Sequence, residues 1–178
     1  MDQGVPVTDG GSSLTEDDLA LRDRLIAEAD TNGHAIVQVP AEDGEAPFTF
    51  SVGAYRSFGV PEGIVVGLPP DAGRHLVNVY VHRVAAGKKY IPGVRYHDFF
   101  DGTPITFERV AKGHYFPYFG TAFLLHPDGD FPALQLIVPT ADTVWPWQPQ
   151  APAGFARWQR ILTVSGSPES WVPGVNGP

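Results

Sequence analysis

Hydrophobic and polar residues alternate along residues 48–52 (FTFSV), and this period of two is typical of a strand with one buried face. Residues 64–66 (IVV) form an unbroken β-branched run, which suits a strand covered on both faces. Between them, residues 55–59 (YRSFG) have the composition of a turn. We therefore expect a hairpin in the core, with polar side chains presented where its first strand ends.

Two other segments have a helical pattern. Thr15 followed by three acidic residues is typical of a helix start, and an apolar stripe runs from there to Asn32. Residues 70–86 repeat apolar side chains every four residues and stop at Gly87, although their valines also suit a strand. Further strands are predicted at 34–40, 105–110 (with Glu108 facing outward) and 131–139, and a short helix at 153–162. The aromatic segment 114–124 fits either a helical turn or a strand.

These elements predict a single α+β domain over residues 14–163, in which a bent, mostly antiparallel sheet is packed by two or three short helices. Residues 1–13 are rich in Gly, Ser and Asp, and residues 164–178 are rich in Gly, Pro and Ser. A flexible N-terminal tail and an extended C-terminal tail are therefore expected. A chain of 178 residues that is 43% hydrophobic can bury one core of this kind.

The charge balance restricts the partners of the chain. Its 12 basic and 20 acidic residues give a formal net charge of -8, and no basic cluster exceeds the pair at 88–89, so neither nucleic acid nor a membrane is an expected partner. The absence of cysteine excludes disulfides and thiolate metal sites. Because the chain also lacks a secretory signal pattern and a long apolar run, a cytoplasmic location is expected.

Several short motifs follow one another along the chain. They are NGH at 32–34, FSVGA at 50–54, GVPE at 59–62, VGLP at 66–69, Asn78 with Arg83 and Gly87, HY at 114–115 with Tyr118, ALQL at 133–136, Pro139, and WPW at 145–147. Their order and spacing resemble the bacterial domain of unknown function family 4262, over about residues 20–150. The resemblance implies an α+β bacterial protein without an established activity. The chain departs from the family pattern at residues 139–143, so a specialised loop is expected there.

His114, Tyr118 and Glu62 are the candidates for acid–base chemistry. A histidine can hold or release a proton near neutral pH, and a phenol can donate a hydrogen bond to a developing oxyanion. The competing interpretation is packing, because residues 115–123 hold five aromatic side chains. Glu62 lies among apolar residues, where burial would raise the pKa of its carboxyl and suit it as a base, or where it simply caps the turn.

Five residues are candidates for ligand binding. Gln135 interrupts an apolar strand, and a buried amide needs partners, so it either fastens a neighbouring loop or contacts a ligand. Tyr55 and Arg56, in the turn, suit a carboxylate or a planar ligand, or are ordinary solvated residues. Trp145 and Trp147 either seal the edge of the core or wall an apolar cavity.

The sequence offers no pattern for a metal or a cofactor. His75, Asn78 and His82 share one face of the second helix, but their spacing matches no metal motif, so a polar surface stripe is the favoured interpretation. Dinucleotide, P-loop and α/β-hydrolase motifs are absent. We therefore predict no metal and no cofactor, although a flavin or a haem bound without a motif stays open.

The favoured hypothesis is a small-molecule enzyme of bacterial metabolism, secondary metabolism included, that needs no cofactor. His114 or Glu62 would transfer a proton, and Tyr118 or Arg56 would stabilise charge in a cyclisation, isomerisation, elimination or hydrolysis. The alternatives are a non-catalytic module that binds a small ligand or a protein, and a flavin- or haem-associated protein. Whether the chain is catalytic and whether it forms a homodimer both stay open.

Overall fold

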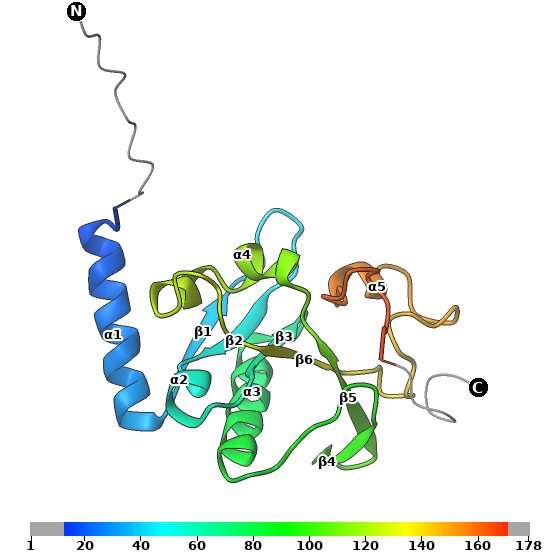
Figure 1. Ribbon diagram of the computed structural model, residues 1–178. Helices are drawn as coiled ribbons and strands as arrows, with labels where there is room; N and C mark the ends of the chain where they lie inside the picture. Colours follow the sequence, from blue (N-terminus) through cyan, green and yellow to red (C-terminus); the bar gives the residue numbers. More distant parts are fainter. Residues whose placement is uncertain (1–12, 171–178) are drawn as a thin grey trace, which may run out of the picture.

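The computed structural model describes residues 13–170, which are arranged around one six-stranded sheet (Figure 1). Its strand order is β1-β2-β3-β6-β5-β4, and every neighbouring pair is antiparallel except β3 and β6. The strands are β1 (Ala35–Val39), β2 (Phe48–Val52), β3 (Glu62–Val66), β4 (Tyr96–Phe100), β5 (Thr103–Arg109) and β6 (Ala133–Ile137). The predicted α+β domain with a mostly antiparallel sheet is confirmed, and β2 pairs with β3 as the expected hairpin.

The first helix, α1 (Glu16–Asn32), begins where the acidic cluster predicts. Thr15 Oγ1 accepts a hydrogen bond from the backbone N–H of Asp18 at 3.1 Å, and the Asp18 carboxylate accepts one from the backbone N–H of Thr15 at 3.0 Å. This reciprocal pair satisfies two donors at the helix start. The helix ends at Gly33 and leads directly into β1, so α1 stands beside the β1 edge of the sheet (Figure 1).

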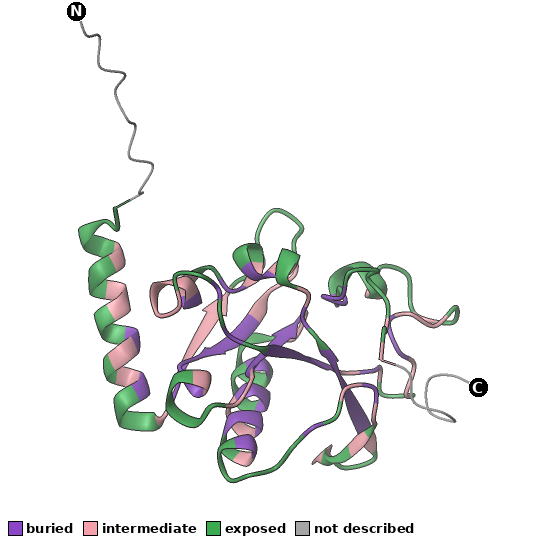
Figure 2. Cartoon of the chain, viewed as in Figure 1, coloured by how far each residue is buried: buried purple, intermediate pink, exposed green. Residues whose placement is uncertain are grey.

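The helix α3 (Pro70–Ala85) covers one face of the sheet. Its buried residues, Leu76 among them, pack with Phe107 of β5, and Figure 2 shows the buried side of the helix turned toward the sheet. The close approach depends on Gly73, because a Cβ atom there would lie 2.7 Å from Thr49 Oγ1 of β2. The predicted second helix is therefore confirmed. Three of its valines, Val77, Val81 and Val84, lie on the buried side of α3.

The aromatic segment covers the opposite face, and it is helical rather than extended. Phe119 packs against Phe50 of β2 with 5.1 Å between ring centroids. The turn that follows β2 is also helical. The short helices are α2 (Ala54–Phe58), η1 (Lys112–His114), α4 (Tyr115–Tyr118) and η2 (Gly120–Leu124).

Residues 159–170, which we call the strap, follow α5 (Phe155–Trp158) and lie across β6 and β5. The Gln135 amide of β6 fastens the strap through its backbone. Its Nε2 donates to the carbonyl of Arg160 at 2.8 Å, and its Oε1 accepts the N–H of Leu162 at 2.8 Å. The strap therefore covers this part of the sheet.

Glu108 of β5 is buried beneath the end of the strap, so the prediction that it faces outward is wrong. Its carboxylate accepts the backbone N–H groups of Glu169 at 3.1 Å and of Ser170 at 3.2 Å. These hydrogen bonds replace those that an exposed carboxylate would form with water. They also hold residues 164–170, which were expected to be part of a tail, against the domain. The remaining expected tail residues, 1–12 and 171–178, lie outside the described residues.

Candidate functional site

Glu62, one of the predicted acid–base residues, is buried at the start of β3 and is 1% exposed. Its Oε2 accepts the hydroxyl of Ser51 at 2.5 Å, and its Oε1 accepts the backbone N–H of Tyr55 at 2.9 Å. Burial raises the pKa of Glu62 from 4.5 to about 7, although these hydrogen bonds act in the opposite direction. The carboxyl therefore fixes the start of α2, and its protonation changes near neutral pH.

Tyr55 and Arg56 do not join the other predicted residues around one cavity. Arg56 is exposed and forms an ion pair with Asp30 of α1 at 2.8 Å. Tyr55 is half-buried, with its ring centroid 5.8 Å from that of His126. Arg56 thus links α2 to α1, and a role of these two residues in ligand binding stays a prediction.

Gln135 is fully buried, and both ends of its amide are occupied by the strap. Of the two roles expected for it, fastening a neighbouring segment is the one that its contacts provide. A ligand could reach this amide only after the strap had moved away.

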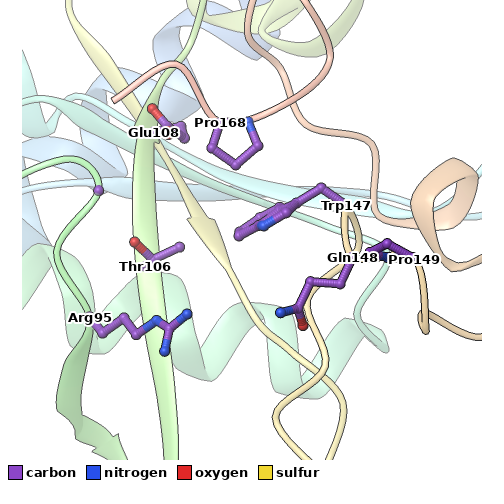
Figure 3. Close-up of a pocket in the computed structure, with 8 residues that line it drawn as sticks. Arg95, Thr106, Glu108, Trp147, Gln148, Pro149 and Pro168 are labelled. Carbon is purple, nitrogen blue, oxygen red and sulfur yellow. The ribbon is translucent and has the colours of Figure 1, made fainter. Parts of the chain in front are cut away.

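Trp145 and Trp147 stack with 5.3 Å between their ring centroids, and Trp145 is 1% exposed. Trp147 instead lines a cavity of about 270 Å³. Figure 3 shows its ring, the Arg95 guanidinium and the Gln148 amide directed at the same space. None of the other predicted site residues lines this cavity. Trp145 therefore belongs to the core edge, and only Trp147 has the expected position on a cavity wall.

His114 and Tyr118 line a common cavity of about 350 Å³, which we call the Tyr118 pocket. The Tyr118 ring lies 4.9 Å from the Phe48 ring and 6.1 Å from the His114 ring, measured between centroids. His114 Nε2 lies 2.9 Å from the carbonyl oxygen of Thr163, so this side chain also contacts the strap. The residues that line the pocket are Glu45, Ala46, Phe48, Val66, His114, Pro117, Tyr118, Arg157, Trp158 and Arg160.

One wall of the Tyr118 pocket comes from Arg157, Trp158 and Arg160, which sequence reasoning missed. Trp158 is anchored by its Nε1–H, which donates to the carbonyl of Gly67 at 3.0 Å. Gly67 has a φ of +83°, and a Cβ there would lie 2.9 Å from the Trp158 carbonyl oxygen, so this approach requires glycine. The signal in the sequence is the run RWQR at 157–160, two cations around a tryptophan in an acidic chain.

The two arginines are free to bind an anion. Neither Arg157 nor Arg160 forms an ion pair or a side-chain hydrogen bond with any residue between 13 and 170. Both guanidinium groups are exposed, and both line the pocket. An unpaired guanidinium offers a planar fork of donors that fits a carboxylate or a phosphate.

These features define a single α+β domain with a small pocket between one face of the sheet, α4 and the C-terminal segment formed by α5 and the start of the strap. The chain belongs to the family described as domain of unknown function DUF4262, whose model matches residues 28–152. No curated protein and no solved structure matches the chain. The family match ends before Arg157, so the cationic wall of the Tyr118 pocket lies outside it. In the part of the chain that the structure describes, no helix has the length and apolar character needed to cross a membrane.

Proposed function

We propose that this protein binds a small molecule, a planar anion, in the Tyr118 pocket. The observation that supports this most is the presence of two guanidinium groups, Arg157 and Arg160, on the same cavity as the ring of Tyr118 and without a partner within residues 13–170. A guanidinium attracts a carboxylate, while aromatic rings provide flat apolar contact area. This is the non-catalytic alternative left open by the sequence, with its ligand class made specific.

Glu62 does not line the pocket shared by His114 and Tyr118, so the three predicted acid–base residues do not form one cluster, which favours binding over chemistry. The Glu62 carboxylate accepts hydrogen bonds from the Ser51 hydroxyl and the Tyr55 backbone N–H, whereas His114 contacts Thr163 of the strap. Among the described residues, no hydrogen bond joins Glu62, His114 and Tyr118 to one another. A catalytic acid and base acting on one substrate must lie within reach of the same atoms.

The charge of the pocket also fits an anion. The chain carries a formal net charge of -8, yet this cavity is lined by two arginines that form no ion pair within residues 13–170. Glu45 lines the same pocket and opposes an anion. We expect a Glu45→Gln variant to bind the anion about two- to threefold more tightly, because one repulsive charge is removed.

The test is an NMR titration of the full chain with 2-naphthoate, followed through the indole N–H signal of Trp158. A fragment of this size should bind with a Kd of about 0.1–1 mM. The double variant Arg157→Gln/Arg160→Gln should weaken binding about tenfold or more, since both charge-assisted contacts are lost. Arg109→Gln, which removes an exposed arginine outside the pocket, is the matched control and should leave the affinity unchanged.

Two related ligands separate charge from shape. 2-Naphthamide has the same rings without the charge, and decalin-2-carboxylate keeps the charge on a saturated frame. Both should bind more weakly than 2-naphthoate. Equal binding of the amide would argue against an anion site, and equal binding of the saturated acid would argue against a planar one. Full binding by the double arginine variant would reject the proposal.

A second candidate function, acid–base catalysis at His114, is favoured by one contact. Because the Thr163 carbonyl can only accept, the 2.9 Å contact places the proton of a neutral His114 on Nε2 and leaves the lone pair on Nδ1. A histidine oriented in this way can act as a base toward a ligand in the pocket. Tyr118 would then be the donor to a developing negative charge.

This second candidate depends on the tautomer of His114, which a long-range proton–nitrogen NMR spectrum of the imidazole measures. At a pH where the ring is neutral, the form with the proton on Nε2 should dominate. A dominant Nδ1–H form would remove the base, and the catalytic candidate would then fail while the binding proposal would be unaffected.

A further inference from the structure

A third cavity, of about 330 Å³, lies between α1, β1 and α3, and it contains none of the predicted site residues. We call it the His34 pocket. Its lining residues are all within the stretch 28–152 that matches the family model, unlike the wall formed by Arg157, Trp158 and Arg160. They are Glu28, Asn32, His34, Ile36, Arg74, Asn78 and His82.

The floor of the His34 pocket is built from two polar side chains. His34 is 5% exposed, and its Nε2 lies 2.7 Å from Asn78 Oδ1. Because an amide oxygen can only accept, the Nε2–H of His34 donates this hydrogen bond. The Asn78 Nδ2 group is then left with two donors, and neither is bonded within residues 13–170. His34 Nδ1 is buried and has no partner with good hydrogen-bond geometry there, although the backbone of Asn32 lies close enough to affect the pKa of His34. A buried nitrogen without a well-placed partner, such as His34 Nδ1, is uncommon in a folded core, whereas the amide of Asn78 is half-buried and can reach a ligand in the pocket.

His34 is held in its neutral form. Burial lowers its pKa, and the neighbouring imidazole of His82, 5.7 Å away between ring centroids, acts in the same direction. The hydrogen bond with Asn78, the backbone of Asn32 and the charge of Glu28 oppose this only in part. The permanently charged cation of this cavity is then Arg74 and its carboxylate is Glu28, with the imidazole of His82 on the same wall as Arg74.

Arg74 and Glu28 are unpaired charges on opposite elements of the same cavity. Glu28 belongs to α1 and has no ion pair or hydrogen bond with any described residue. Arg74 belongs to α3, and its side chain makes one hydrogen bond within residues 13–170, a long one of 3.4 Å from Nε to Gln38 Oε1. They do not form an ion pair with each other. A cavity that separates a free cation from a free anion complements a ligand that carries both charges.

We propose that the His34 pocket is a binding site for a free α-amino acid, independent of the Tyr118 pocket. The ligand carboxylate would contact the Arg74 guanidinium and the Asn78 amide, and the ligand ammonium would contact the Glu28 carboxylate. Ile36 is the apolar lining residue, so a small aliphatic side chain fits best. The site requires no metal, and among the described residues no group of three or more metal-ligating side chains is found.

The experiment is an NMR titration of the uniformly nitrogen-15-labelled full chain with alanine, valine and leucine, followed at the Asn78 side-chain amide. We expect saturable shifts at millimolar concentrations. Arg74→Gln and Glu28→Gln should each weaken binding about tenfold, since each removes one charge-assisted contact. Arg24→Gln and Glu16→Gln, on exposed positions of α1, are matched controls and should leave the binding unchanged.

Two modified ligands test the requirement for both charges. N-acetylvaline lacks the ammonium and valine methyl ester lacks the carboxylate, so each should bind much more weakly than valine. Equal binding of either one would overturn the proposal, as would no shift at Asn78 up to about 20 mM amino acid. A shift that is abolished by Arg157→Gln/Arg160→Gln would place the ligand in the Tyr118 pocket and would also overturn it.

Discussion

The stability that Glu62 contributes is expected to fall by about 3 kcal/mol as the pH rises from 4.5 to 7. Its pKa is raised in the folded protein from 4.5 to about 7, so between these values the folded chain holds a proton that the unfolded chain has released. The contribution is fully present below pH 4.5 and is lost as the pH rises through about 7, the pKa of Glu62 in the folded protein. Each unit of pKa difference corresponds to about 1.4 kcal/mol.

The measurement is urea unfolding at several pH values for the wild-type chain and for Glu62→Gln. Glutamine keeps the size of the side chain and does not titrate, so the difference between the two free energies of unfolding should carry the pH dependence. Glu42→Gln, on an exposed turn, controls for the loss of one surface carboxylate. A difference that stays constant from pH 4.5 to 7 would mean that the hydrogen bonds of Ser51 and Tyr55 keep Glu62 ionised.

Replacing Gln135 by leucine is expected to cost about 2–3 kcal/mol and to loosen the strap. The buried amide bonds the carbonyl of Arg160 and the N–H of Leu162, and both backbone groups would be left without a partner. Hydrogen exchange at Leu162 should become faster in Gln135→Leu. The affinity for 2-naphthoate should also fall, because the strap carries Arg160 of the Tyr118 pocket.

The matched control for this variant is Gln150→Leu, which changes an exposed glutamine without a partner among the described residues. It should leave both stability and exchange unchanged. If Gln135→Leu left the exchange of Leu162 unchanged, the strap would be held by the apolar packing of Ile161 and Leu162 instead of by the amide.

Local patterns predicted the elements of this fold well. The capping residues Thr15 and Asp18 fix the start of α1, and the alternation at 48–52 gives β2. The turn at 55–59 was harder, because it becomes α2 through the bond from the Tyr55 N–H to Glu62, which lies beyond the turn itself. A local pattern contains no information about such a partner.

The strap explains most of what the sequence did not reveal about the candidate site. Glu108 was expected to face solvent because its own strand alternates, but a segment some sixty residues later covers it. The same segment occupies Gln135 and contacts His114, which were expected to be in or near a pocket. Long-range covering of this kind depends on tertiary packing, and spacing along the chain does not encode it.

The central claim is that α5 and the strap complete an anion pocket with Tyr118, and the most direct measurement is a crystal structure of the full chain soaked with 2-naphthoate. We predict the carboxylate within hydrogen-bond distance of Arg157 and Arg160, with the rings against Tyr118. A ligand bound instead beside Trp147 or in the His34 pocket, or one that leaves both arginines without contact, would contradict the account.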